Sequence, residues 1–359
     1  MCAVTDVLML SLGGPSSYTG LVAAHLGADC RVAGYRTRHL LQTADILHVH
    51  WPENLQPEGM SPGAMRNRLG WWMLGRTILR VRRRGAIVWT AHNLARHEPV
   101  SAGAERQHEA RLSRFRTQVD IAIAMGAEQL PALHRRFPEI APDRWRIVPH
   151  PHYREVYAHC AAPAATRARL DIPEQARVVA MIGMIRPYKG IPEAIDVFKA
   201  AARPDEFLLI GGQQADAALR ERLLHGARGC SNIRIVDTPI SDYDLASLYR
   251  ASNLALLNYA HILNSGSVFA ALSLDCPTLA PRTPTFDALA AAHPGWVTLF
   301  EQPLTPEALR RCLDRLAVSP PAGSPDLSRH DPGRVGAAHR LIYAEALALA
   351  AQRRAEAAG

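Results

Sequence analysis

The sequence predicts an α/β fold of two doubly wound, Rossmann-like domains, and three observations support this prediction. Short apolar runs alternate with longer helical patterns along the whole chain. The alternation restarts after a proline-bearing stretch of small residues at 158–165. The chain has 359 residues, of which 48% are hydrophobic, which is enough for two ordinary domains with separate cores. Strands that alternate with helices imply right-handed crossovers, so both sheets should be parallel.

The first domain is expected to cover residues 1–160 and to carry the acceptor side of a binding site. A helix should begin at about Tyr18. The expected strands of this domain are residues 7–12, 46–50, 87–90, 121–124 and 145–148.

The second domain is expected to cover residues 161–330. Its expected strands are residues 178–182, 206–210, 233–236, 254–257, 278–279 and 297–300. The proline-rich stretch at 319–325 cannot be a buried strand, because proline donates no ladder hydrogen bond. An alanine-rich helix should follow from about 332 to 355, and we expect residues 331–359 to pack back toward the N-terminal domain.

Composition and charge limit the partners and the compartment. Lys and Arg number 41 against 33 Asp and Glu, so anionic partners such as sugar nucleotides, acidic lipids or nucleic acid are favoured. No aromatic RNP motif occurs, so nucleic acid is not expected. The six cysteines form no C-x-x-C pair, the start lacks a basic n-region, and no apolar run reaches about 18 residues. We therefore expect a cytoplasmic protein.

The first candidate site residues follow the first strand of the second domain. Gly183 would let the backbone approach a ligand, and Arg186 and Lys189 could each reach a diphosphate. A solvated basic turn would explain these residues about as well.

A second loop of this kind follows a later strand and precedes an apolar helix. Its small and polar residues, Asn264, Ser265, Gly266 and Ser267, would present backbone N–H groups at a helix start, where anions bind. An Asn or Ser N-cap alone accounts for the loop almost as well. Two anion-competent loops at strand ends of one domain favour a diphosphate site.

Titratable residues gather at the ends of three strands of the first domain: His48, His50, Glu53, His92, His97, Glu98, His150 and His152. Period-two spacing places His48 and His50 on one face of their strand. Either that pair or His150 with His152 could begin a zinc site, but no third ligand has a recognisable spacing, so metal binding is not expected. Three such clusters at strand ends favour an active-site wall over packing histidines.

The motifs DILHVHWPE, TAHNLARHE, HPHYREVY, GMIRPYKGI, LNSGSVFAALSLDCPTLAP and HPGWVTLFE occur in this order along nearly the whole chain. Together they resemble the xanthan-type β-mannosyltransferases, GT-B glycosyltransferases that act on a lipid-linked glycan. The resemblance implies two Rossmann-like domains facing a central cleft, with GDP-mannose as donor and inversion at the anomeric carbon. It implies no cofactor beyond the nucleotide sugar.

The second half is also similar, more distantly, to the retaining GT-B family. Lys189 occupies the position of the lysine that binds the diphosphate in that family, and Arg186 lies two positions after the position of that family's arginine. Ile262 and Ala270 occupy the two glutamate positions of its E-x7-E element, so both carboxylates are absent, which argues against retention.

The resemblance also implies roles for single residues. His92 and His50 would contact the donor sugar, and the backbone of Thr238, Pro239 and Ile240 would lie beside the nucleobase. Inversion also needs a base for the acceptor hydroxyl, which should come from the first domain, where His50, Glu53, His92, His97 and Glu98 are candidates. Glu98 or His97 is preferred, and Glu53 is the competitor.

A D-x-D pair, Asp242 and Asp244, is typical of metal-binding glycosyltransferases of another architecture. Here both acids precede an amphipathic pattern, so we predict first-turn residues of a helix. No metal ion is expected.

The segment from Arg66 to Arg84 mixes tryptophan and arginine at helical spacing. An ordinary surface helix would explain it. A lipid-linked acceptor favours instead peripheral contact with the anionic inner face of the membrane.

Two other functions remain open at this point. One is a retaining GT-B glycosyltransferase with another nucleotide sugar. The other, from a different class, is a non-catalytic protein that binds nucleotide sugars or nucleic acid.

Overall fold

The computed structural model describes residues 4–36, 43–55, 62–95, 102–213 and 217–358. The chain forms two compact units, one of Met1–Pro151 with Arg329–Gly359 and the other of His152–Ser328. Each unit contains a six-stranded sheet whose described strand pairs are all parallel. The α/β fold class predicted from the sequence is therefore confirmed.

The first sheet has the strand order β2-β1-β3-β4-β5-β6. Its strands are β1 (Thr5–Met9), β2 (Cys30–Gly34), β3 (Ile46–His50), β4 (Ala86–Thr90), β5 (Ile121–Ala124) and β6 (Trp145–Ile147). The chain adds β2 on one side of β1 and all later strands on the other. The order therefore reverses between β1 and β3, and ligands of doubly wound sheets bind beyond the carboxyl ends at such a point.

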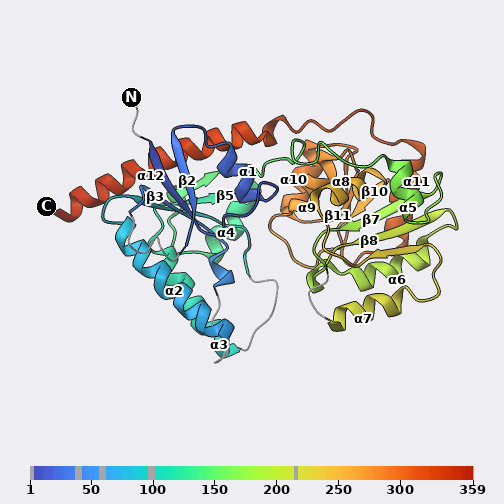
Figure 1. Cartoon of the computed structure of the whole chain (residues 1–359), viewed down its shortest axis with the longest axis horizontal. Helices are drawn as coiled ribbons and strands as arrows, with labels where there is room; N and C mark the ends of the chain where they lie inside the picture. The colour runs from blue at the N-terminus through green and yellow to red at the C-terminus, as the bar shows by residue number, and fades with distance from the viewer. Residues whose placement is uncertain (1–3, 37–42, 56–61, 96–101, 214–216, 359) are drawn as a thin grey trace. The chain divides into compact units, whose positions relative to one another are not determined.

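Helices cover both faces of the first sheet (Figure 1). On one face lie α1 (Tyr18–Ala24) and α12 (Pro332–Ala358), which contact each other. On the other lie α2 (Pro62–Val81), α3 (Ala102–Arg116) and α4 (Leu130–Arg136). Side chains of β4 alternate accordingly, since Val88 packs in the core that includes Tyr343 of α12, while Trp89 packs against Phe115 of α3.

The second sheet has the order β12-β11-β10-β7-β8-β9, which reverses between β7 and β10. Its strands are β7 (Arg177–Ile182), β8 (Glu206–Gly211), β9 (Ile233–Val236), β10 (Leu254–Leu256), β11 (Thr278–Pro281) and β12 (Val297–Phe300). Its helices are α5 (Pro163–Arg169), α6 (Ile191–Ala201), α7 (Ala217–Gly226), α8 (Asp242–Arg250), α9 (Gly266–Ser273), α10 (Pro284–Ala292) and α11 (Pro306–Val318).

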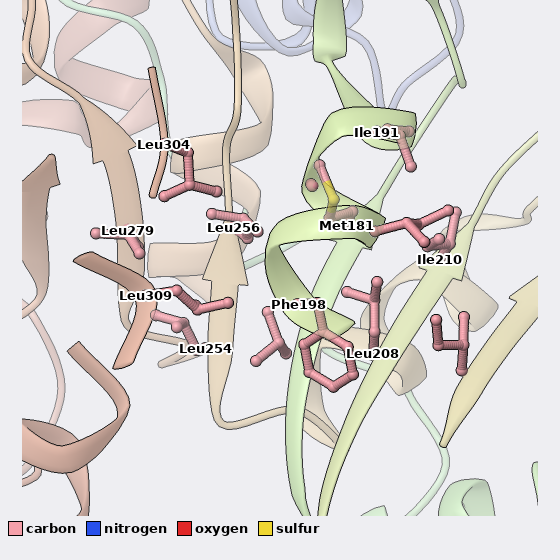
Figure 2. Close-up of a cluster of buried hydrophobic side chains, with 14 of the residues drawn as sticks. Met181, Ile191, Phe198, Leu208, Ile210, Leu254, Leu256, Leu279, Leu304 and Leu309 are labelled. Atoms are coloured by element: carbon pink, nitrogen blue, oxygen red, sulfur yellow. The ribbon is translucent and has the colours of Figure 1, made fainter. Parts of the chain in front are cut away.

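The core of the second unit lies between this sheet and helices α6 and α11. Figure 2 shows Phe198 of α6 and Leu309 of α11 among buried side chains of the central strands, including Leu208 and Leu254. Burial of apolar side chains on strands and helices alike fixes the strand ends in space, and with them the loops that follow.

Besides small shifts of strand ends, such as β1 at Thr5–Met9 where residues 7–12 were expected, two details differ from the sequence predictions. Strand β2 was not predicted, because its sequence CRVAG contains one large aliphatic residue, Val32, and ends in a glycine. The expected domain boundary at 160/161 lies inside the second unit, which begins at His152. Tyr153 and Tyr157 are already buried there, and the proline-bearing stretch begins helix α5.

Among the described residues, no helix is both long and apolar enough to cross a membrane.

Candidate functional site

The predicted diphosphate residues lie at the point where the order of the second sheet reverses. Gly183, Arg186 and Lys189 follow β7, and the loop from Asn258 to Ser267 follows β10, the strand beside it. Both loops leave the same edge of the sheet because the two strands are parallel. This edge is where doubly wound folds bind their ligands.

Residues from the two loops converge at Gly183. This glycine has φ +107°, and a Cβ at this position would lie 3.3 Å from Nζ of Lys189 and 3.9 Å from Oγ of Ser267. A side chain there would fill the space between the ammonium group and the serine hydroxyl. The glycine therefore keeps a backbone approach open beside a cation and a hydroxyl.

Lys189 is buried at the end of the short 3₁₀ helix η5 (Pro187–Lys189). Burial, and then the charge of Arg186, lower the pKa of its ammonium group to about 8. A buried ammonium group is costly without an opposite charge, so an anion beside Lys189 would be stabilised strongly. Arg186 is half-buried and donates from Nε to Sδ of Met184 at 3.2 Å.

The other side of this point is the N-terminus of α9. Ser265 is the N-cap, and its Oγ accepts from the backbone N–H of Val268 at 3.3 Å. Its hydroxyl also donates to the buried Tyr259 hydroxyl at 3.4 Å. The first turn carries Gly266 and Ser267 and no acidic residue, so its N–H groups and helix dipole favour an anion.

The predicted nucleobase segment, Thr238, Pro239 and Ile240, lies between β9 and α8. Ile240 reaches the carboxyl end of β8, because its Cδ1 would be 3.1 Å from a Cβ on Gly211. The segment thus lies at the same edge of the sheet as the two diphosphate loops.

The D-x-D pair begins helix α8, as the sequence predicted. Ser241 is the N-cap and accepts from the N–H of Asp244 at 3.1 Å. The hydrogen bond from Ser241 is the largest cause that lowers the pKa of Asp244 below its usual range, and the contact with Arg169 also lowers it, whereas burial opposes them. Asp242 and Asp244 have the geometry of first-turn acids.

In the first unit, His50 ends β3 and His92 follows β4, the neighbouring strand. His50 Nδ1 and His92 Nε2 form a buried hydrogen bond of 3.0 Å. Trp51 stacks on His92 with ring centroids 3.8 Å apart. Its backbone is left-handed, with φ 45°, which is unusual for a bulky residue and marks a specially held position. Sequence reasoning did not single out Trp51.

Tyr18 of α1 was also missed as a site residue. Its ring centroid lies 5.0 Å from that of His92, 5.7 Å from His50 and 5.2 Å from His150. The nearest sequence signal was its place at the start of the predicted helix after the first strand.

The imidazoles in this cluster are kept neutral. Burial is the largest cause, and it lowers the pKa values of His48, His50 and His92 well below 6.5 and that of His150 to about 4. A neutral imidazole offers one donor and one acceptor, which suits hydroxyl groups better than phosphate.

His48 has a different surrounding from His50, although both face the same side of β3. Its Nδ1 lies 2.8 Å from the Tyr343 hydroxyl and its Nε2 lies 2.8 Å from Oγ1 of Thr90. These bonds tie the sheet to α12, so His48 is a structural residue.

Glu53 belongs to the 3₁₀ helix η2 (Pro52–Asn54) and accepts a hydrogen bond from Nδ2 of Asn93 at 3.2 Å. Asn93 directly follows His92, so Glu53 lies next to the histidine cluster. It also lines a cavity of about 30 Å³ together with Glu105 and Glu109. The other two predicted base residues, His97 and Glu98, lie outside the described residues.

Within the ranges that the structure describes, no three His, Cys, Asp or Glu side chains are grouped so that they could hold a metal ion. His150 belongs to the first unit and His152 begins the second.

No protein-family model matches the chain. The GDP-mannose:glycolipid 4-beta-D-mannosyltransferase of Xanthomonas campestris pv. campestris is 30% identical to it over 317 residues, which are 86% of this chain and 82% of that protein. The chain belongs to this family of glycosyltransferases.

Solved structures agree with the family in fold. This glycosyltransferase is similar to sucrose-phosphate synthase from Thermosynechococcus elongatus, with a TM-score of 0.65 at 16% identity over 99% of this chain and 100% of the other. HepE of Anabaena, solved with UDP and glucose, gives a TM-score of 0.61 at 13% identity over 98% and 99% of the two chains. WaaG, a glycosyltransferase of lipopolysaccharide biosynthesis, gives 0.60 at 14% identity over 96% and 98%. The fold is GT-B, and the enzyme is a nucleotide-sugar-dependent hexosyltransferase.

Proposed function

We propose that this glycosyltransferase moves mannose from GDP-mannose onto a lipid-linked or other glycan acceptor, with inversion and formation of a β-linkage. One observation carries the transfer chemistry, namely the convergence of Gly183, Lys189 and Ser267 beyond the point where the second sheet reverses. The choice of mannose, of GDP and of a glycolipid acceptor is supported by the name of the Xanthomonas relative.

The second unit supplies the groups that stabilise the leaving group. As the bond to the anomeric carbon breaks, negative charge grows on the diphosphate. Arg186, Lys189 and the N–H groups at the start of α9 would meet this charge. The proposed enzyme needs no metal ion and no cofactor beyond its donor, because these groups supply the positive charge.

The first unit supplies groups for the sugars. In this proposal His92 and His50 hydrogen-bond hydroxyls of the donor sugar, since their neutral rings can donate and accept. A carboxylate or imidazole of the same unit removes the proton from the acceptor hydroxyl. Glu98, His97 and Glu53 are the candidates, and Glu53 is the one whose contacts the structure describes.

Inversion is favoured over retention by the residues of α9 and the loop before it. Ile262 and Ala270 stand at the two positions where the retaining GT-B family has glutamates, and Ala270 is buried within α9. No carboxylate occupies these positions to bind a donor in the retaining manner.

Helix α2 supports contact with an anionic membrane. Residues 62–84 contain no Asp or Glu. Leu69, Trp72 and Leu79 are more than half exposed at helical spacing, Arg76 is exposed in the same stripe, and Arg83 is exposed in the turn that follows the helix. An apolar and basic face of this kind fits the headgroup region of an anionic bilayer, where a lipid-linked acceptor would be found. We propose that the enzyme works at the inner face of the membrane.

The test of the donor and acceptor is a transfer assay with purified protein and a lipid-linked oligosaccharide, using a panel of nucleotide sugars. Transfer from GDP-mannose with a β-linked product, identified by NMR of the anomeric proton, is the expected result. An α-linked product would refute the proposal that the enzyme inverts the anomeric configuration. Transfer from another nucleotide sugar but not from GDP-mannose would refute the proposal that the donor sugar is mannose. Donor binding without turnover on any acceptor would favour a non-catalytic binding protein.

The test of the membrane face uses Trp72→Ala with Leu79→Ser in flotation with vesicles containing about a third anionic lipid. We expect the double variant to bind far less than the wild type. If the wild type binds neutral vesicles as well as anionic vesicles, the proposed electrostatic contribution to membrane binding is wrong.

A further inference from the structure

Asn258 follows β10, and its side chain reaches the loop that follows β7. Its Nδ2 donates to the carbonyl oxygen of Gly190 at 2.8 Å. Gly190 has φ +57°, and a Cβ there would lie 2.6 Å from the carbonyl oxygen of Asn258 and 2.7 Å from its Nδ2. No real Cβ approaches so closely, so the asparagine and the glycine are interlocked.

Gly190 ends the turn that carries Lys189. It is the C-cap of η5 and the N-cap of α6, and its N–H donates to Pro187 at 3.1 Å. Any change in the conformation of Gly190 would therefore move the Lys189 backbone, the residue directly before it.

The two loops have a second connection two residues further along. The N–H of Ala260 donates to the carbonyl oxygen of Tyr188 at 3.0 Å. The rings of Tyr188 and Tyr259 lie beside each other, with centroids 5.8 Å apart. The two loops are thus joined by a backbone hydrogen bond between Ala260 and Tyr188 and by a side-chain hydrogen bond from Asn258 to Gly190. A substitution of Asn258 removes the side-chain bond and leaves the backbone groups of Ala260 and Tyr188 in place.

We propose that Asn258 is a positioning residue for the donor diphosphate, whose carboxamide holds the Lys189 turn against the loop that leads into α9. This inference rests on the proposed function, because it takes Lys189 as a diphosphate ligand. Asn258 acts through Gly190. Without its hydrogen bond, the turn must be ordered when the donor binds, and that ordering costs binding free energy.

The chain offers a matched control in Asn253, which precedes β10 as Asn258 follows it. Asn253 Oδ1 accepts from the N–H of Val178 at 2.9 Å, at the amino end of β7 and away from the diphosphate edge. Each asparagine thus makes one side-chain bond to the backbone of the β7 segment, and Asn253 Oδ1 also accepts from Nη2 of Arg167 at 3.0 Å. Asn258→Ala and Asn253→Ala remove these bonds at opposite ends of the sheet.

The experiment is calorimetric titration of the full chain with GDP and with UDP, for the wild type, Asn258→Ala, Asn253→Ala and Lys189→Ala. We expect Asn258→Ala to lose about 10-fold in GDP affinity and Asn253→Ala to keep wild-type affinity while its thermal midpoint falls. Lys189→Ala should lose about 10- to 100-fold, because a contact to a charged group is lost.

The pH profile separates positioning from a general loss of stability. In the wild type, GDP affinity should fall above about pH 8, where buried Lys189 loses its proton. In Asn258→Ala the freed turn lets water reach Lys189, and the fall should move to higher pH. Among the described residues, Arg186 is the charged group that acts on Lys189, whereas burial raises the pKa of Tyr259 on the facing loop and keeps it neutral.

Wild-type GDP affinity in Asn258→Ala, beside weakened binding in Lys189→Ala, would overturn the positioning role alone. Equal losses in Asn258→Ala and Asn253→Ala, with an unmoved pH profile, would do the same. If Lys189→Ala binds GDP as the wild type does, the diphosphate site itself is wrong and this inference fails with it.

Discussion

His50 Nδ1 and His92 Nε2 are hydrogen-bonded at 3.0 Å in the interior of the first unit, although 42 positions separate the residues in the sequence. Neighbouring strands β3 and β4 bring them together, and Trp51 and Tyr18 enclose the pair. One of the two rings must donate and the other accept, so the bond fixes complementary tautomers and excludes a doubly protonated pair.

Acid should therefore unfold the first unit. The pKa values of His150 and His339 are lowered to about 4 by burial, whereas the unfolded chain protonates its histidines near pH 6.5. The stability that the neutral rings contribute is complete above about pH 6.5 and is lost as the pH falls toward 4, at about 1.4 kcal/mol per pH unit for each histidine. Urea unfolding followed between about pH 5 and pH 7 measures this slope.

The control for the acid prediction is His339→Leu, which removes one buried histidine on α12. Among the hydrogen bonds that the structure describes, this side chain makes one, from Nδ1 to the carbonyl oxygen of Val335 one turn earlier in the helix. In this variant, the slope of the free energy of unfolding against pH should decrease by an amount that corresponds to the uptake of nearly one proton on unfolding. An unchanged slope would show that His339 is protonated equally in the folded and unfolded chain.

The diphosphate assignment predicts that Lys189→Ala and Arg186→Ala each weaken donor binding or turnover. A lost contact to a charged oxygen should cost about 1.5–3 kcal/mol, or roughly 10- to 100-fold. Lys189 should matter more, because it is buried beside Gly183 and Ser267 whereas Arg186 is half-buried. Donor kinetics measured in both variants check this, and near-normal values in both would refute the assignment.

Metal independence follows from the same cationic groups. Activity should survive exhaustive chelation with EDTA, and Asp242→Asn should cost little beyond the stability of α8, since Asp242 lies in the first turn of that helix. Transfer assays before and after chelation test the prediction. Activity lost with EDTA and restored by manganese or magnesium would contradict it.

Much of the fold could be predicted because the buried strands of parallel sheets are continuous apolar runs. Strands β3 and β5 are buried throughout and have the predicted bounds. The edge strands β9 and β12 are partly exposed but also have the predicted bounds, because three of the four residues in each are Ile, Val, Leu or Phe, whereas Val32 is the only such residue in β2. The two loops at the reversal point were also predictable, since parallel neighbouring strands end at the same edge.

Side-chain contacts between distant segments were not predictable. The tie between His48 and Tyr343 spans 295 positions and depends on how α12 packs on the sheet. Trp51 became visible as a site residue only through its left-handed backbone and its stacking on His92. Asparagine is a common residue in turns, so the sequence gives Asn258 no special role. The role proposed for it follows from a hydrogen bond to a glycine 68 positions earlier.

The assignment of the base can be tested at three residues. Glu98→Gln should lose at least about 10²-fold in turnover while donor affinity changes little, which is the usual scale of general-base catalysis. His97→Ala is the parallel test.

Glu53→Gln tests the competing assignment. Glu53 accepts from Asn93, the residue after His92, so its carboxylate is held next to the buried histidine pair rather than free in solvent. Glutamine at this position can still accept from Asn93 through its amide oxygen but cannot take a proton. A selective loss of turnover in Glu53→Gln, with Glu98→Gln and His97→Ala active, would therefore move the base to the η2 segment. A product that keeps the donor's anomeric configuration would exclude all three as inverting bases.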